Sequence, residues 1–184
     1  MTDVTIRPAT PADIPAIARI YAHAVQNGTA TFELEPPDEA EMTRRMTALL
    51  DGNFPYLAAE SSGALAGYAY AGLYRPRPAY RFTVEDSIYL GHAAAGKGLG
   101  RALLTALVAA CQEAGIREIL AVISDKGAEG SISLHEKLGF VETGRMGRVG
   151  FKFGRWLGVV NMQLSLKPAK KKRSLRGAKP AVPA

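Results

Sequence analysis

The chain has 184 residues, of which 47% are hydrophobic and 22% are charged. This composition fits one globular domain with a sizeable core, and no apolar run reaches the ~18 residues of a membrane-spanning helix. The formal net charge of +6 comes from the end of the chain, since the last 18 residues hold seven Lys or Arg and no acid, whereas the rest holds 16 basic and 17 acidic side chains. We therefore expect a near-neutral domain over residues 1–166 and a basic, disordered tail over residues 167–184, whose contact with nucleic acid or anionic lipid is weak.

The first half of the chain predicts a strand, two helices and a hairpin. Residues 4–9 have the pattern of an opening strand, and Thr10 is expected to cap the helix that follows. A second helix is expected to begin near Asp38. Its inward-facing side chains are predicted to be Met42, Met46, Leu49 and Leu50. Residues 56–60 and 64–74 flank a Ser-Ser-Gly turn, which predicts an antiparallel hairpin.

The second half predicts four strands and two helices. The strands are expected over residues 81–90, 117–124, 140–146 and 156–166, and the helices over residues 99–114 and 131–140. The predicted order is therefore β-α-α-β-β-β-α-β-α-β-β. This order is typical of an α/β or α+β fold with one mixed sheet.

Cys111 is the single cysteine and lies in an apolar helical stretch. We expect a buried core residue in a reducing compartment, and hence a cytoplasmic protein. The N-terminal segment has no apolar signal core, so export is not expected. His, Cys and Asp residues do not cluster at metal-ligand spacing, and no metal is expected.

The stretch AGKGLGR, residues 95–101, places three glycines between a predicted strand and a predicted helix. Backbone N–H groups at a helix N-terminus bind anions, and glycine lets the backbone approach a phosphate closely. The glycine spacing matches neither a Walker A loop nor a dinucleotide fingerprint. From these residues alone, a diphosphate cradle and a tight strand-to-helix turn are equally good interpretations.

Five segments taken together resemble a known enzyme family. They are YRPRPAYRFTVEDSIYL, YLGHAAAGKGLGRALL, LAVIS, SLHEKLGF and VGFKFGRWLGVVNMQ. The glycine segment resembles the acyl-CoA pyrophosphate loop of the GNAT N-acetyltransferases, and the whole set resembles their phosphinothricin/methionine-sulfoximine N-acetyltransferase branch over residues 4–166. The resemblance implies a GNAT-like fold with one mixed, centrally splayed sheet flanked by helices. It also implies acetyl transfer from acetyl-CoA to the α-amino group of a small amino acid or analogue.

The resemblance further implies where acetyl-CoA binds. The strand before the glycines offers backbone groups to the pantetheine arm, and the glycine loop holds the diphosphate. The implied residues are Ile88, Tyr89, Leu90, Gly96, Lys97, Gly98, Leu99, Gly100 and Arg101. A backbone N–H near Leu90 then polarises the thioester carbonyl.

Glu85 and His135 match catalytic positions of the family. An amine that attacks a thioester must lose a proton, and Glu85 is implied as the general base. From the residues alone, a structural glutamate paired with an arginine is the simpler interpretation of Glu85. His135 stands where most GNAT members carry a tyrosine that protonates the leaving thiolate, and the imidazole either donates that proton or orients the site by hydrogen bonding.

The implied substrate is a small amino-acid-like amine with a carboxylate, which calls for fixed cations and aromatic walls. The substrate residues implied by the resemblance are Phe32, Arg75, Arg77, Tyr80, Glu85, Asp86 and Ser87. For the two arginines, a solvated surface position is the alternative. The resemblance also implies a homodimer, with Phe153, Arg155 and Trp156 at the interface, in the core or in a cleft wall.

Three features depart from the family pattern. Ala95 stands where Arg or Gln is usual, and Gly158 stands where Asp is usual. The segment after Ser124 is one residue longer and lacks the usual Asn that contacts the cofactor arm. Because none of these changes removes the implied base, we expect an active acetyltransferase. The alternatives are acetyl transfer to a peptide N-terminus or another amine, and a non-catalytic CoA-binding or nucleic-acid-associated module that uses the basic tail.

Overall fold

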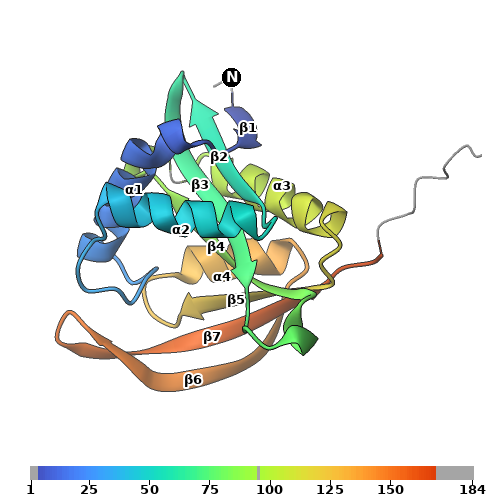
Figure 1. The fold of residues 1–184 in the computed structure, drawn as a ribbon. Helices are drawn as coiled ribbons and strands as arrows, with labels where there is room; N and C mark the ends of the chain where they lie inside the picture. Colours follow the sequence, from blue (N-terminus) through green and yellow to red (C-terminus); the bar gives the residue numbers. More distant parts are fainter. Residues whose placement is uncertain (1–3, 95, 169–184) are drawn as a thin grey trace, which may run out of the picture.

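The computed structural model describes residues 4–94 and 96–168, which form a seven-stranded sheet with helices on both faces (Figure 1). The strands are β1 Val4–Pro8, β2 Tyr56–Ser61, β3 Ala64–Leu73, β4 Thr83–Leu90, β5 Glu118–Ser124, β6 Val141–Lys152 and β7 Arg155–Ser165. The helices are α1 Ile14–Asn27, α2 Glu39–Asp51, α3 Leu99–Glu113 and α4 Glu129–Lys137. The predicted order of strands and helices is confirmed. The departure at Ala95 and the tail beyond residue 168 lie outside the described residues.

The sheet splays at its centre. Its order is β1-β2-β3-β4-β5-β7-β6, and β4 and β5 run parallel to each other. Their ladder joins Thr83–Glu85 to Glu118–Leu120 and then stops. Beyond that point β4 stays paired with β3 as far as Leu90, and β5 stays paired with β7 as far as Ser124. The facing edges of β4 and β5 therefore separate after Glu85, and the central splay that the family resemblance implies is present.

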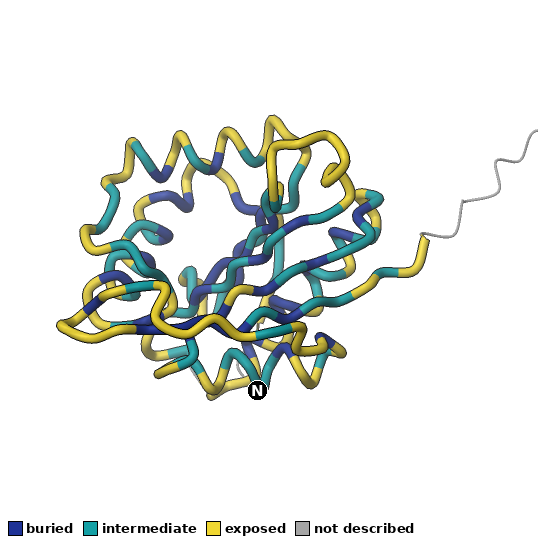
Figure 2. The backbone as a smooth tube through the Cα atoms, turned by 90° about the horizontal axis from the view of Figure 1, so that it is seen from below, coloured by how far each residue is buried: buried dark blue, intermediate teal, exposed yellow. Residues whose placement is uncertain are grey.

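Two apolar cores lie on opposite faces of the sheet. On one face α3 buries Leu103, Leu104 and Leu107 completely, together with Cys111. On the other face α1 and α2 pack against a layer of tyrosines that includes Tyr68. Figure 2 shows the buried residues gathered along the central strands, with the outer faces of the helices exposed. Each fully buried leucine contributes about 1.5–3 kcal/mol, so this packing fixes β4 between the two cores.

The start of α1 is tied to the sheet by an ion-pair network. Asp13 accepts a hydrogen bond from the Thr10 backbone N–H at 2.7 Å, and Pro11–Asp13 form a short 3₁₀ turn before α1. The Arg7 guanidinium of β1 donates two bonds to Asp13, at 2.7 and 2.8 Å, and also contacts Glu60 of β2. The hydrogen bonds from Arg7 lower the pKa of Asp13 to about 2. The predicted cap at Thr10 is therefore built into a contact between strand and helix.

Two expectations from the sequence are wrong in detail. Leu50 is 40% exposed, because it lies at the edge of the inward face that Met42 and Met46 form. β6 extends to Lys152 rather than ending at residue 146. The extension is possible because Phe153 and Gly154 both adopt positive φ, as a two-residue hairpin turn requires, and so return the chain directly into β7.

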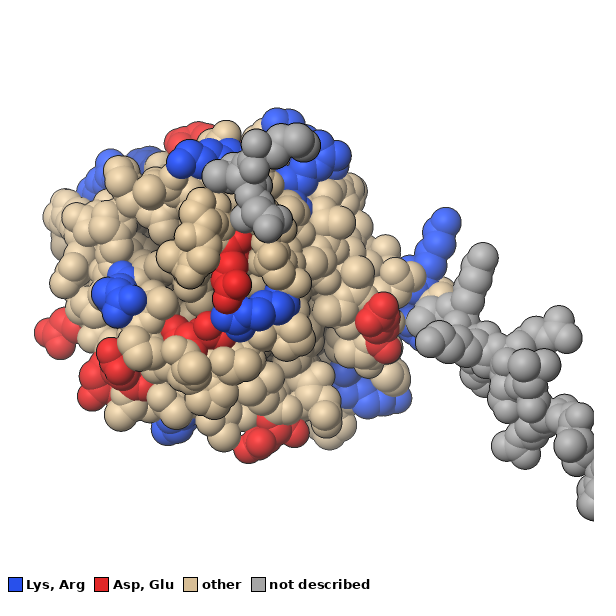
Figure 3. All heavy atoms as spheres, turned by 90° about the horizontal axis from the view of Figure 1, so that it is seen from above, with Lys and Arg blue, Asp and Glu red and all other residues tan. Residues whose placement is uncertain are grey.

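Charged side chains of both signs are interspersed on the face of the molecule shown in Figure 3. This mixture agrees with the near-neutral balance of residues 1–166. None of the described helices has both the length and the apolar character that crossing a membrane requires.

The α3 core gives a direct test of the packing. Leu107→Ala removes a fully buried side chain and leaves a cavity beneath the sheet, so we expect a loss of about 2–5 kcal/mol in the free energy of unfolding. Leu50→Ala is the matched control, because that leucine is 40% exposed and its loss should cost less than about 1 kcal/mol. Urea titration followed by circular dichroism measures both values, and equal losses would contradict the assignment of the core.

Candidate active site

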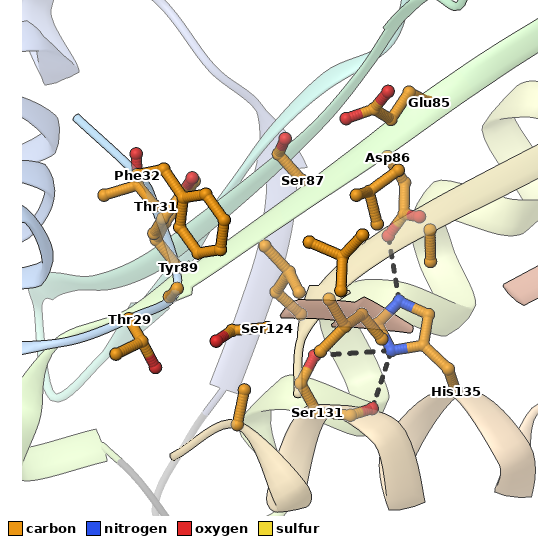
Figure 4. Close-up of a pocket in the computed structure, with 17 residues that line it drawn as sticks. Thr29, Thr31, Phe32, Glu85, Asp86, Ser87, Tyr89, Ser124, Ser131 and His135 are labelled. Carbon is orange, nitrogen blue, oxygen red and sulfur yellow. Dashed lines mark hydrogen bonds and ion pairs between the residues drawn. The ribbon is translucent and has the colours of Figure 1, made fainter. Parts of the chain in front are cut away.

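A cavity of about 250 Å³ opens where β4 and β5 separate. It is lined by residues 29–32 of the α1–α2 connection, 85–89 of β4 and 121–124 of β5, and by Ser131 and His135 of α4 (Figure 4). Val159 of β7 also lines it, so five separate parts of the chain meet at the splay. The cavity exists because, beyond Glu85, β4 pairs only with β3 and β5 pairs only with β7, which leaves a gap between β4 and β5.

The structure brings most of the predicted catalytic and substrate residues to this cavity. Those that line it are Phe32, Glu85, Asp86, Ser87 and His135, together with Ile88 and Tyr89 from the predicted cofactor set. Arg75, Arg77 and Tyr80 do not line it and lie exposed on the β3–β4 connection. Sequence reasoning missed Thr29, Thr31 and the β5 residues 121–124. Both threonines lie within three residues before Phe32, so the predicted substrate loop around Phe32 was the available signal.

Glu85 and Asp86 project to opposite sides of β4, because neighbouring strand residues alternate (Figure 4). Burial raises the pKa of Glu85, the charge of Asp86 raises it further, and Arg75 opposes both effects. Glu85 belongs to none of the ion pairs formed by the described residues. The carboxyl group is therefore half-buried and unpaired at the mouth of the splay, which suits a base more than a structural ion pair.

His135 and Asp86 form a buried pair whose side chains are 2% and 1% exposed. The His135 Nδ1 donates to the Ser131 carbonyl oxygen at 2.7 Å, and Nε2 lies 3.0 Å from Asp86 Oδ2. Both ring nitrogens are thus engaged, and a proton lies between Nε2 and the carboxylate. Burial lowers the pKa of His135, but the hydrogen bond and charge of Asp86 outweigh it, and the pKa is raised overall.

The second oxygen of Asp86 has a different environment. Asp86 Oδ1 is buried and lacks a hydrogen-bond partner among the described residues. The imidazole has no free nitrogen, so within the pair Asp86 is the member with an unused polar atom. A buried polar atom without a partner costs free energy, and such groups mark places where a ligand or a reacting group completes the site.

Residues 96–98 form an open turn into α3, and they do not line the cavity. Gly96 and Gly98 have φ of 75° and 79°, and a Cβ at either position would meet nothing within 4 Å. Both glycines are therefore needed for their backbone conformation, and the space beside them is open. Gly100 differs, because a Cβ there would lie 3.3 Å from Leu90 and 3.4 Å from Leu134. Its small size lets α3 approach β4 and α4.

This turn and the splayed edge fit a long ligand with a phosphate end. The open start of α3, a helix of 15 residues, presents backbone N–H groups beside the exposed side chains of Lys97 and Arg101. The edge of β4 that faces β5 has backbone groups that the β5 ladder does not use after Glu85. Acetyl-CoA has this shape and chemistry, and the residues present match it.

Two of the departures from the family pattern, Gly158 and the segment after Ser124, lie in contact with each other. Asp125 Oδ1 accepts a hydrogen bond from the Gly158 backbone N–H at 2.8 Å. A Cβ at Gly158 would lie 2.7 Å from Asp125 Oδ2 and 2.5 Å from the Met146 carbonyl oxygen. Gly158 is therefore required by the position of the Asp125 carboxylate, which occupies the space that a side chain at residue 158 would need.

Residues 6–160 match the family model described as acetyltransferase (GNAT) domain. The chain belongs to the GNAT acetyltransferase family. This GNAT chain is 51% identical to phosphinothricin N-acetyltransferase of Alcaligenes faecalis over 162 residues, which cover 88% of the chain and 82% of that relative. It is 41% identical over 167 residues to the L-methionine sulfoximine/L-methionine sulfone acetyltransferase of Pseudomonas paraeruginosa, covering 90% and 96%.

A solved structure extends the comparison to the fold. A GNAT superfamily phosphinothricin acetyltransferase from Sinorhizobium meliloti, in complex with acetyl-CoA, superposes with a TM-score of 0.85 at 46% identity, and the match covers 91% of this chain and 94% of that one. The predicted GNAT fold and acetyltransferase class are therefore confirmed. The described residues hold no group of three or more His, Cys, Asp or Glu arranged to bind a metal ion.

The Asp86–His135 pair makes a titration prediction. Asp86→Asn removes the carboxylate charge that raises the pKa of His135, while burial continues to lower it, so that pKa should fall relative to the parent. NMR titration of the His135 ring measures it. Because the folded-state pKa is raised, the protonated imidazole stabilises the fold at low pH, and this contribution is lost as the pH rises through the raised pKa.

Asp51→Asn is the control for this titration, because it removes an exposed carboxyl at the end of α2. It should leave the His135 titration unchanged. An unchanged His135 pKa in Asp86→Asn would contradict the pairing.

Proposed function

We propose that this GNAT enzyme transfers the acetyl group of acetyl-CoA to the α-amino group of a small amino acid or analogue, of the phosphinothricin, methionine sulfoximine or methionine sulfone type. The observation that carries the proposal is the half-buried, unpaired Glu85 with its raised pKa, at the point where β4 and β5 separate. The names of the relatives support the substrate class, since they are acetyltransferases of these compounds.

Acetyl-CoA supplies the activated acyl carbon when it is bound. In this proposal the pantetheine arm lies along the free edge of β4 at Ile88, Tyr89 and Leu90, and a backbone N–H near Leu90 polarises the thioester carbonyl. The diphosphate lies in the open turn formed by Gly96, Lys97, Gly98, Leu99, Gly100 and Arg101. Support comes from the positive φ and open surroundings of Gly96 and Gly98.

Glu85 acts as the general base. The α-amine is largely protonated at neutral pH, and a carboxylate whose pKa is raised by burial accepts its proton more readily than an ordinary one. The proton moves to Glu85 directly or through one water. Asp86, on the other face of β4, is kept apart from this step by the alternation of the strand (Figure 4).

The Asp86–His135 pair serves the leaving group in the same proposal. Its imidazole has no free nitrogen, so His135 orients Asp86 by hydrogen bonding. When the hydrogen bond between Nε2 and Oδ2 breaks with the shared proton on the carboxyl group, the Asp86 O–H protonates the leaving thiolate and Asp86 becomes a carboxylate. This assignment joins the two roles considered for His135. It also gives Asp86 a catalytic role in place of substrate binding.

In this proposal the acceptor amine lies between the α1–α2 connection and the β3–β4 connection, which forms the rim of the cavity. Phe32 and Ser87 line the cavity wall near Glu85. Arg75, whose guanidinium lies 4.9 Å from the Tyr74 ring centroid, lowers the pKa of Glu85 and so lies within electrostatic reach of it. We assign Arg75, with Arg77 and Tyr80 on the same connection, to the rim, where a cation holds the substrate carboxylate.

We further propose a cytoplasmic homodimer. Five side chains on the β6–β7 hairpin are large, apolar and about half exposed, namely Met146, Val149, Phe151, Phe153 and Trp156. Such a surface is covered in a stable protein, and a second copy of the chain suits it. The buried, unpaired thiol of Cys111 and the use of acetyl-CoA agree with the cytoplasm.

A CoA-release screen tests the function. Phosphinothricin, methionine sulfoximine, methionine sulfone and the ordinary amino acids are compared as acceptors, together with a short peptide amine. We expect turnover of the amino-acid analogues at neutral pH. If only the peptide is acetylated, or if acetyl-CoA raises the melting temperature while no amine is turned over, the proposed substrate class is wrong.

Glu85→Gln tests the base. We expect kcat/KM at neutral pH to fall by about 10²–10⁴-fold, because the amine loses its proton acceptor. The parent enzyme should lose activity as the pH falls through the raised pKa of Glu85, and the variant should lack that limb. Glu142→Gln, an exposed β6 carboxyl paired with Arg145, is the control. Undiminished activity in Glu85→Gln would exclude the assignment.

A further inference from the structure

Lys152 is an unusual residue for the interior of this fold. It ends β6 and is 3% exposed, yet it belongs to none of the ion pairs of the described residues. Its Nζ donates a hydrogen bond of 2.8 Å to the Thr31 carbonyl oxygen. Burial lowers the pKa of Lys152, and the charge of Glu33 partly opposes this effect. A buried ammonium without a carboxylate is costly, so its position needs a reason.

The Thr31 carbonyl, to which Lys152 donates, belongs to a residue in the wall of the cavity. Residues 29–32 line the cavity and come from the α1–α2 connection, which has no strand or helix of its own at this point. Thr31 Oγ1 lies 3.0 Å from the Tyr21 hydroxyl of α1, and Thr29 Oγ1 donates to the Lys126 carbonyl at 2.5 Å. The loop is therefore held at three points, by α1, by the β5–α4 connection and by β6.

A second contact joins the same strand to the same loop. The Phe32 ring lies directly on the backbone of Gly150, since a Cβ at Gly150 would be 2.5 Å from Phe32 Cε2. Gly150 and Lys152 are two residues apart on β6 and so face the same side of the hairpin. One touches the ring of Phe32, and the other holds the carbonyl of the residue before it.

We infer that the segment Gly150–Lys152 positions Phe32 and thereby sets the size of the acceptor end of the cavity. Lys152 is a positioning residue, because it acts through the Thr31 carbonyl and does not line the cavity itself. A charge-assisted hydrogen bond in a dry environment fixes a backbone carbonyl more firmly than a neutral donor does. The inference rests on the proposed function, which places the acceptor amine beside Phe32.

Two variants perturb the wall independently. Lys152→Met keeps the apolar stem and removes the donor to Thr31, and Gly150→Ala keeps the donor and pushes the Phe32 ring toward the cavity. We expect Lys152→Met to raise KM for the amine about 10-fold or more, with a smaller change in kcat and an unchanged KM for acetyl-CoA. Gly150→Ala should penalise bulky amines more than small ones. Gly144→Ala is the matched control, because a Cβ at that β6 position meets nothing within 4 Å.

A double-mutant cycle separates positioning from simple stabilisation. In a Phe32→Ala background, Lys152→Met should have little further effect on KM for the amine, because the wall that it positions is already gone. If Lys152→Met lowers the melting temperature while leaving the amine KM and the ratio of kcat/KM between bulky and small amines unchanged, the residue is structural only and the inference is overturned.

Hydrogen exchange gives a readout that does not depend on turnover. Amide exchange in residues 29–33 should accelerate in Lys152→Met relative to the parent and to Gly144→Ala. Unchanged exchange in that segment would overturn the inference even if the enzyme acetylates the expected amines. Accelerated exchange in an enzyme that turns over none of them would instead mean that the loop is positioned as inferred and that the proposed function has failed.

Discussion

The site depends on the shortness of the ladder between β4 and β5. Three residue pairs join the two strands, and the last of them includes Glu85. Because each strand keeps its outer partner, separation costs only the hydrogen bonds along the inner edges, while the cores on both faces hold the strands in place. The same separation exposes backbone groups for an extended ligand, opens the cavity and leaves a carboxyl group at the branching point.

Burial acts on the ionisable groups of this region in different directions. It raises the pKa of Glu85, and it lowers the pKa of Lys152. For His135 it favours the neutral form, but the adjacent Asp86 reverses the result. Burial to different degrees thus accompanies a carboxylate with increased proton affinity, an imidazole that retains its proton and an ammonium that donates to one carbonyl. The pKa shifts of these groups differ because each group has a different charged or hydrogen-bonding neighbour, and not only because each is buried to a different degree.

The order of strands and helices could be predicted from the sequence patterns. The family could be predicted from the resemblance of five segments, and that resemblance in turn predicted the splay of the sheet. Local patterns also located the turn at Gly98 and the inward faces of α2 at Met42 and Met46. The roles of Glu85, His135 and the arginines stay predictions. What the sequence did not disclose are contacts between distant residues: the pairing of His135 with Asp86 and the hold of Lys152 on Thr31, which is 121 residues away. The spacing of apolar residues along the chain reports local helices and strands, and it carries no information on contacts between residues that are far apart in sequence. The length of β6 was missed because its glycines resemble a loop.

The contact between Asp125 and Gly158 restricts how this chain can change. The carboxylate at one position fills the volume that the other would need, so an acidic side chain at both would place two charges and too many atoms in one space. Neither residue can be exchanged freely while its neighbour stays. A side chain at position 158 therefore demands a simultaneous change of the connection after Ser124 and a shift of the β6 backbone, because the Met146 carbonyl oxygen lies in the same space.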